Sequence, residues 1–487
     1  MRQLRLLALL SPAILLVPVV ACEDSSSSPA TPFTFEAGPG FEAGPPAEAG
    51  PLPDAGGVDA ADVFVPPTPK GVTVTVIDNS LPKANVRVIS QDATGAVVGD
   101  AKTDATGKLT IATVPSSVTV LATSNTSPTP VTFFAVAEGD TLVVRIPPPV
   151  AVEQAPVGHY LVTFTPAALQ GQSTQAVVTA GGGCSNSTGD TTATLLVDLF
   201  PSCIAASNAI LGDGANVDGT RDGFAFKKGV AAPAANATSN VTLPAWTAPG
   251  ATTLTASHLP SGYLSVDATL YMIANGASFG TGVAPGSDQI NSVAGRTFQT
   301  ATGFADAYQS FVHTVDDTGG QVESSIIRRE TAPATASTTL PDFDFTNALP
   351  YITAAAVDTT TAARPIVTLT SDAPLTAVDG GIVVVTSLNG SENAVTWTFV
   401  VPASAAASFK VPALPTDAEA ITFTPAFTSK VDHAAFFEAT QIPSYKETKL
   451  IPIVPGASLD LLDASVPLPI NGTVRLTTWA PQPPPLP

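Results

Sequence analysis

Gly71-Val72-Thr73-Val74-Thr75-Val76 is the stretch that decides the fold of this chain. Its valines alternate with threonines, so a β-strand would place the three valines on one face. The alternation returns at Asn85-Val86-Arg87-Val88, and the turn sequence Asp78-Asn79 lies between the two segments. No window of the chain shows the period of a helix, so we expect an all-β protein.

Residues 71–147 also hold a motif that is shared with a known domain. In Thr103-Asp104-Ala105-Thr106-Gly107-Lys108-Leu109-Thr110-Ile111, a tight turn from Asp104 to Gly107 leads into a strand. Together with Leu81-Pro82-Lys83-Ala84-Asn85-Val86, this motif resembles the carboxypeptidase regulatory-like domain, a prealbumin-like β-sandwich. The resemblance implies an accessory domain that spaces, stabilises or binds. Further strands are predicted at 108–112, 117–122, 131–137 and 141–146.

Short alternating segments continue after the proline run Pro147-Pro148-Pro149, with proline and glycine at their joints. This spacing is typical of β-sandwiches. Asn240-Val241-Thr242-Leu243-Pro244-Ala245-Trp246 resembles Ser337-Thr338-Thr339-Leu340-Pro341-Asp342-Phe343, a distance that suits repeated sandwich-sized units. Strands are predicted at 160–164, 175–179, 192–196, 223–226, 264–273, 324–328, 365–370, 381–386, 395–401, 420–424 and 472–478.

The predicted fold is therefore a tandem array of β-sandwiches of the prealbumin-like or Ig-like type. We expect a first sandwich at 71–147, a second all-β domain at 155–340 and a third at 341–480. A proline-rich tail at 481–487 follows the third domain.

The N-terminus carries an export signature that ends at Cys22. Arg2 and Arg5 precede an apolar run from Leu6 to Ala21, which is too short and too broken by proline to span a bilayer. This order resembles a bacterial lipoprotein signal, which implies a signal peptide at 1–21 and lipid attached to Cys22. We expect a chain held in the bacterial cell envelope, at the outer membrane. The alternative is an ordinary secretory signal cut after Ala21.

Residues 22–70 are predicted to be a disordered tether. A hexapeptide recurs in them, first as Phe35-Glu36-Ala37-Gly38-Pro39-Gly40 and then as Phe41-Glu42-Ala43-Gly44-Pro45-Pro46. Proline, glycine and like charges keep such a segment from burying enough surface to offset the entropy of ordering. A tether of this kind would hold the folded part away from a membrane.

The remaining cysteines, Cys184 and Cys203, are predicted to form a disulfide. Once Cys22 is assigned to lipid, they are the only pair left, and exported proteins meet oxidising conditions. Two buried free thiols are the alternative. A metal site at these two cysteines is a weaker alternative, since no histidine lies between them.

Composition excludes one class of partner. The 487 residues include 40 acidic and 20 basic side chains, and removal of Arg2 and Arg5 with the signal leaves a formal charge of −22. Such a chain repels nucleic-acid phosphates, and no basic cluster offsets the repulsion. We therefore expect no nucleic-acid partner.

No catalytic motif stands out in the sequence. HExxH, CxxC and the Walker loop are all absent, and His159, His258, His313 and His433 are scattered singly. His313, close to Asp316, is expected on a solvated loop. A triad built from residues far apart in sequence stays open, but we do not expect an enzyme.

One weak metal candidate lies in the glycine-rich segment 212–223. Its oxygen-bearing side chains suit calcium, although their spacing is not that of an EF-hand. Asp-Gly turns that join two strands are the alternative reading. No other cofactor is expected. The candidate ligands are Asp213, Asn216, Asp218 and Asp222.

Trp246, Trp397 and Trp479 each lie in or beside a predicted strand, where they would stack on sugars if exposed or fill a core if buried. The leading hypothesis is a lipid-anchored cell-envelope protein with a structural, adhesive or binding role. Its partners would be the membrane, through the anchor, and an envelope polysaccharide or protein. The alternatives are a carbohydrate-binding surface lipoprotein and an envelope hydrolase with an unrecognised site in 155–487.

Overall fold

The computed structural model of the chain shows an almost entirely β protein, as the alternation at Val72 to Val76 predicts. Among the described residues the only α-helix is the single turn α1, Tyr445–Thr448. Val72, Val74 and Val76 are all fully buried. The structure describes residues 71–78, 81–124, 127–146, 155–165, 175–181, 185–190, 194–200, 207–216, 220–260, 265–283, 295–316, 321–332, 335–361, 364–389, 393–421, 428–456 and 468–481.

The first unit is a sandwich of two sheets. In one sheet β1 lies between β5 and β8, antiparallel to β5 and parallel to β8. The strands of the other sheet run in the order β4-β3-β6-β7. Valines of both sheets form one buried core. The strands of unit 1 are β1 Val72–Asp78, β2 Leu81–Pro82, β3 Arg87–Gln91, β4 Val97–Lys102, β5 Lys108–Ile111, β6 Ser117–Ser124, β7 Ser127–Phe134 and β8 Thr141–Ile146.

Apart from the short β2, unit 2 repeats this topology. Its sheets have the orders β12-β9-β15 and β11-β10-β13-β14, and its first strand again pairs in parallel with its last. A separate core lies between these two sheets. The strands of unit 2 are β9 Gly158–Phe164, β10 Gln175–Ala180, β11 Ser185–Asp190, β12 Thr194–Leu199, β13 Ser207–Ala215, β14 Arg221–Ala231 and β15 Thr238–Leu243.

Unit 3 has the same order once more, as β20-β21-β16-β24 facing β19-β18-β22-β23. The two echoing segments of the sequence thus contain equivalent strands, β15 and β24, each paired in parallel with the first strand of its unit. The elements of unit 3 are β16 Gly250–Leu254, β17 Ala256–Ser257, β18 Ser265–Ala274, β19 Ala277–Gly280, β20 Gly282–Val283, β21 Arg296–Thr300, β22 Ala307–Asp316, β23 Gln321–Thr331, β24 Ser337–Thr339, β25 Phe343–Asp344 and the 3-10 turn η2 Phe345–Asn347.

Unit 4 is a variant of the pattern. Its small sheet β26-β27-β30 faces strands in the order β32-β31-β28-β29, and its first strand β26 is antiparallel to its neighbour. The elements of unit 4 are β26 Ile352–Asp358, β27 Ile366–Ser371, β28 Gly380–Asn389, β29 Asn393–Val401, η3 Ala403–Ala405, β30 Ser408–Lys410, η4 Thr416–Ile421, β31 Thr428–Ala439, α1 and β32 Thr473–Ala480.

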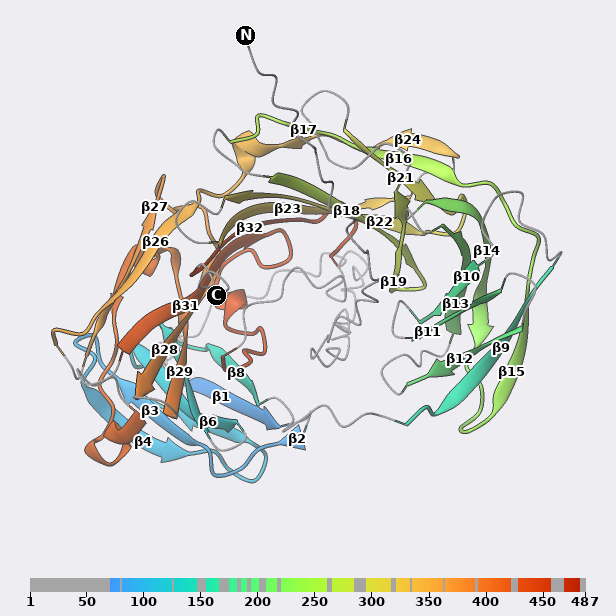
Figure 1. Cartoon of the computed structure of the whole chain (residues 1–487). Coiled ribbons are helices and arrows are strands. Elements are labelled where there is room, and N and C mark those ends of the chain that lie inside the picture. Colours follow the sequence, from blue (N-terminus) through green and yellow to red (C-terminus); the bar gives the residue numbers. More distant parts are fainter. Residues whose placement is uncertain are drawn as a thin grey trace, which may run out of the picture.

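Three of these units share one sheet. Within the described residues it has 12 strands in the order β19-β18-β22-β23-β32-β31-β28-β29-β7-β6-β3-β4. Antiparallel pairing of β23 with β32 joins unit 3 to unit 4, and parallel pairing of β29 with β7 joins unit 4 to unit 1. The units follow an open arc, with unit 1 and unit 2 at its two ends (Figure 1).

The two faces of the shared sheet serve different cores. Trp397 and Phe399 of β29 point into the core of unit 4, whereas Val400 of the same strand points into the core of unit 1. The small sheets of units 1 and 4 therefore cover opposite faces, because successive side chains of a strand alternate. Unit 1 and unit 4 thus share cores as well as hydrogen bonds.

Two expectations about domains and strands differ from the structure. Residues 155–340, expected as one domain, contain two sandwich units. Each unit has its own core cluster, and Ala209, Leu211 and Phe224 of unit 2 also pack into the core of unit 3. The strand expected at 420–424 is wrong at its start, because Ala420 and Ile421 end the 3-10 helix η4. No described helix is long and apolar enough to cross a membrane.

Candidate functional site

An aspartate, a histidine and a serine lie in one row across three strands of the shared sheet. Asp267 of β18 is paired with His313 of β22, and His313 is paired with Ser325 of β23. Directly opposed residues on neighbouring antiparallel strands lie on the same face, with Cβ atoms about 4.5–5.5 Å apart. The register therefore places the three side chains in line.

The row contains one ion-pair contact, between His313 and Asp267, and two buried polar atoms. His313 Nε2 lies 3.6 Å from Asp267 Oδ2, and the Phe311 ring lies 4.8 Å from the imidazole. His313 Nδ1 and Ser325 Oγ are both buried and have no hydrogen-bond partner among the described residues. An unpaired buried polar atom is unfavourable, so this row holds unused hydrogen-bonding capacity.

These residue types are those of a nucleophilic triad, but their arrangement departs from one. In a working triad the serine hydroxyl bonds one imidazole nitrogen, and the carboxylate orients the ring through the other. Here the nitrogen near Asp267 is 3.6 Å away, and Ser325 is fully buried. The three side chains thus follow the Asp-His-Ser order of a triad, but the serine is not accessible to a substrate.

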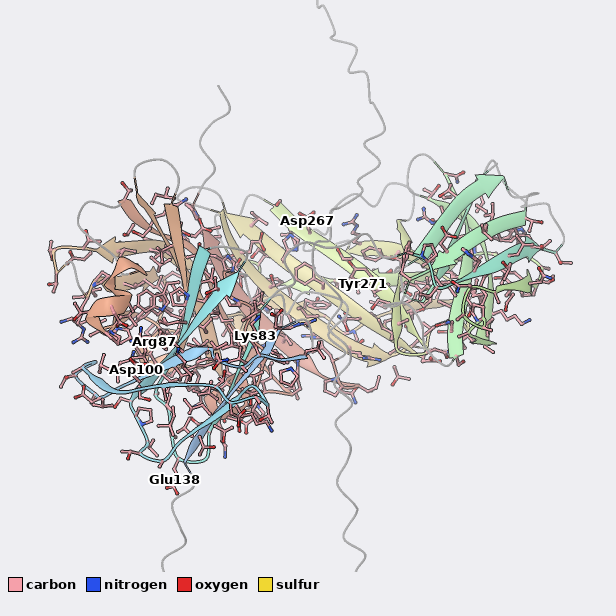
Figure 2. All side chains as sticks on the ribbon, turned by 90° about the horizontal axis from the view of Figure 1, so that it is seen from below. Lys83, Arg87, Asp100, Glu138, Asp267 and Tyr271 are labelled. Atoms are coloured by element: carbon pink, nitrogen blue, oxygen red, sulfur yellow. The ribbon has the colours of Figure 1, made fainter. Side chains whose placement is uncertain are left out.

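The row continues into a partly exposed polar strip along β18. Ser265, Asp267, Thr269 and Tyr271 alternate with buried residues of the unit 3 core. Figure 2 shows Asp267 and Tyr271 on the long sheet between the two ends of the molecule. This strip offers hydroxyl and carboxylate groups to solvent, which are groups that suit a hydrogen-bonding partner.

His313 lies in β22, so the expectation of a solvated loop is wrong. The alternation Phe311, His313, Val315 matches that of a strand, and the adjacent Asp316 and Asp317 obscured this signal in the sequence.

None of the other histidines lies on β22 or on a strand that pairs with it. His159 Nδ1 is 2.7 Å from Asp198 Oδ1 in unit 2, and His258 Nδ1 is 3.0 Å from Asp344 Oδ1 in unit 3. Burial lowers the pKa of His433 on β31. In the described part of the chain, no group of three or more histidine, cysteine, aspartate or glutamate side chains could hold a metal ion.

The calcium candidates flank the hairpin of β13 and β14. The Asp213 carboxylate is buried against Arg221, with Oδ2 at 3.3 Å from Nε, and burial raises the pKa of Asp213. Asn216 Nδ2 donates to Asp222 Oδ1 at 3.1 Å and to Thr220 Oγ1 at 2.8 Å. Asp213, Asn216 and Asp222 thus contact other protein groups within a hairpin. This arrangement agrees with the alternative interpretation, a turn that joins two strands. The fourth, Asp218, lies outside the described residues.

The three cysteines, Cys22, Cys184 and Cys203, also lie outside the described residues. Lipid attachment at Cys22 and the disulfide between Cys184 and Cys203 therefore stay predictions.

The tryptophans serve mainly as core residues. Trp397 is fully buried, and Trp479 is 6% exposed. Trp246 is partly exposed and stacks on Phe164 with ring centroids 4.6 Å apart. Stacking on sugars is thus closed to Trp397 and Trp479, which weakens one argument for carbohydrate binding.

A buried polar network between units 1 and 4 has no signal in the local sequence. Ser117 Oγ donates to Gln91 Oε1 at 3.0 Å, Gln91 Nε2 donates to Thr119 Oγ1 at 2.9 Å, and Thr119 bonds Thr132 at 2.8 Å. Trp397 of unit 4 closes the network by donating to Thr132 Oγ1 at 2.9 Å. A satisfied buried network specifies one docking arrangement.

Comparisons with known proteins add little to this account. No family model matches the chain, and no curated protein matches it. Among solved structures, the Bacillus anthracis TIE protein aligns with 9% identity and a TM-score of 0.14. That alignment covers 57% of this chain and 50% of the other, so the chain spans about half the length of that protein.

Proposed function

We propose that this chain is a lipid-anchored cell-envelope protein whose β-units form a rigid body with a structural, adhesive or binding role. The proposed order is a lipid at Cys22, a tether to residue 70 and four β-units beyond it. The proposed location in the cell envelope rests on the signal sequence from Arg2 to Cys22, and we propose the outer membrane as the site of attachment.

The observation that carries the structural role is the 12-stranded sheet shared by units 1, 3 and 4. Units that share backbone hydrogen bonds and cores hold a fixed geometry, whereas sandwiches on flexible linkers move independently. A fixed arc suits a protein that presents surfaces at a set distance and orientation.

The topology of unit 1 supports the resemblance to the carboxypeptidase regulatory-like domain. Sheets in the orders β5-β1-β8 and β4-β3-β6-β7 make a seven-stranded sandwich, apart from the short β2. We propose that unit 1 is such an accessory domain and that units 2 and 3 are diverged repeats of the same sandwich.

Metabolic labelling with a palmitate analogue in a bacterial host tests the anchor. The full chain should take up the label and sediment with outer membranes. Cys22→Ser should leave unlabelled precursor, and Ser25→Ala should behave like the natural chain. Labelling and membrane retention of Cys22→Ser would overturn the anchor.

The hydrolase alternative has one observation in its favour, the Asp267–His313–Ser325 row. A fluorophosphonate probe tests it on the purified full chain. Labelling that disappears in Ser325→Ala and persists in Ser324→Ala would establish a nucleophile, and the absence of labelling would remove Ser325 as the nucleophile of a hydrolase.

A further inference from the structure

A lysine and an aspartate from different units meet in a dry site. Lys449 follows α1 in unit 4, and Asp140 precedes β8 in unit 1, 309 positions away in sequence. Their side chains are 3% and 1% exposed, and Lys449 Nζ contacts Asp140 Oδ2. Figure 2 labels Glu138, which lies two positions before Asp140 on unit 1.

The two oxygens of Asp140 have different surroundings. Oδ2 accepts a hydrogen bond from the backbone N–H of Ala137 at 2.7 Å as well as the contact from Lys449. Oδ1 is buried and has no hydrogen-bond partner among the described residues. One oxygen is therefore held by two donors, and the other has none among the described residues.

The surroundings of Lys449 Nζ exclude water. The amine donates to the carbonyl oxygen of Ala135 at 3.1 Å and lies 4.8 Å from the centre of the Tyr445 ring. The Tyr445 hydroxyl donates in turn to the carbonyl oxygen of Val400 at 2.7 Å, and burial raises the pKa of Tyr445 well above its usual value. Aromatic and backbone groups thus enclose the amine.

We propose that Lys449 Nζ and Asp140 Cγ join in an intramolecular amide bond that cross-links unit 4 to unit 1. A proton passes from the ammonium to Asp140 Oδ2, the oxygen that it contacts, and the free amine attacks Cγ with its lone pair. The Cγ–Oδ2 bond breaks, its electron pair stays on Oδ2, and a second proton from nitrogen completes a water molecule. The reaction needs no oxidant or other reactant.

Two features of the site favour this condensation over a lasting ion pair. Burial of two charges carries a large desolvation penalty, which a neutral amide removes. The Ala137 N–H donates to Oδ2, where negative charge collects as the Cγ–Oδ2 bond breaks, so it stabilises the departing oxygen. Proximity of the two groups, fixed by the shared sheet, makes the reaction unimolecular.

An exposed pair elsewhere in the chain provides an internal comparison. Lys83 contacts Asp78 at 2.6 Å, but these side chains are 48% and 29% exposed. Water stabilises both charges there, so this pair stays ionic. The cross-link goes beyond the function proposed above and does not depend on it.

Tryptic mapping of the purified full chain tests the cross-link. Trypsin would release Asp140 in peptide 109–145 and, without a cross-link, Lys449 at the end of peptide 447–449. A cross-linked Lys449 resists cleavage, so 109–145 should appear joined to 447–475, with a mass lower by one water than the sum of the two. Fragmentation should place the junction at Lys449 and Asp140.

Two variants serve as controls. Lys449→Arg keeps the positive charge beside Asp140 but cannot form the amide, so the joined peptide should be lost while the chain stays folded. Lys446→Arg changes a neighbouring lysine on α1 and should retain the joined peptide.

The natural chain decides the outcome even if a variant fails to fold. Joined peptide as the main form supports the cross-link. Peptides 109–145 and 447–449 recovered free as the main forms would overturn it, as would a joined peptide that persists in Lys449→Arg.

Discussion

The indole Nε1 of Trp397 donates a 2.9 Å hydrogen bond to Thr132 Oγ1, which lies 265 positions earlier in the chain. Trp397 belongs to β29 of unit 4 and Thr132 to β7 of unit 1, and these two strands pair in parallel. Both residues are fully buried. The bond thus closes the polar network at the junction of two units, where a lost partner leaves a polar atom in an apolar surround.

Trp397→Phe should destabilise the chain by about 2–3 kcal/mol, through the lost hydrogen bond and the smaller ring. Trp479→Phe is the matched control, because the buried Nε1 of Trp479 has no hydrogen-bond partner among the described residues. Denaturant unfolding of the full chain measures both. Equal losses of unfolding free energy would show that the bond to Thr132 contributes nothing.

Gly107 should tolerate alanine less well than Gly276. Both have positive φ, 71° and 77°, which penalises any L side chain by about 1–2 kcal/mol. A Cβ at Gly107 would also lie 2.6 Å from the Val76 carbonyl oxygen, whereas one at Gly276 would meet nothing within 4 Å. Thermal unfolding should show a larger fall in melting temperature for Gly107→Ala; a larger fall for Gly276→Ala would contradict the turn geometry.

The turn at Gly107 has a twin in the same unit. Asp92 Oδ1 and Asp104 Oδ1 each accept from the N–H and the hydroxyl of the threonine two residues later, at 2.8 and 2.7 Å. Each also accepts from the N–H four residues later, at 3.0 Å. These hydrogen bonds lower the pKa of both carboxyls. The largest cause is the hydrogen bond from the Thr94 hydroxyl for Asp92, and the hydrogen bond from the backbone N–H of Lys108 for Asp104.

These two carboxylates should make unit 1 sensitive to acid. Their pKa values in the folded state lie below those in the unfolded chain, so their contribution is complete above the usual aspartate pKa of about 4 and is lost as the pH falls through the lowered values. The double variant Asp92→Asn, Asp104→Asn should lose less stability between about pH 5 and 3 than the natural chain. Melting temperature against pH measures this, and parallel curves would argue against it.

The sequence predicts the local structure of this chain better than its assembly. Alternation at Val72 to Val76 and the turn from Asp104 to Gly107 are local signals, and the structure has a strand and a turn at these places. The echo between the segments at Asn240 and Ser337 likewise marks equivalent strands. Such features depend on neighbouring residues alone.

The pairing of β29 with β7 leaves no comparable local trace. It depends on which edge strands meet, and alternation fixes only the two faces of each strand. The row of Asp267, His313 and Ser325 is hidden for the same reason, because it exists only once three strands are in register. A site assembled across strands needs the fold before it can be recognised.

Native-state hydrogen exchange on the full chain tests most directly whether the units form one rigid body. Amides of β7 and β29 should open together with those of β31 and β32, with one free energy and one dependence on denaturant. Amides of β9 and β15 in unit 2 report on a separate core and serve as the internal comparison. If β6 and β7 instead open at a lower free energy than β28 and β29, unit 1 unfolds on its own and the claim of one continuous body is wrong.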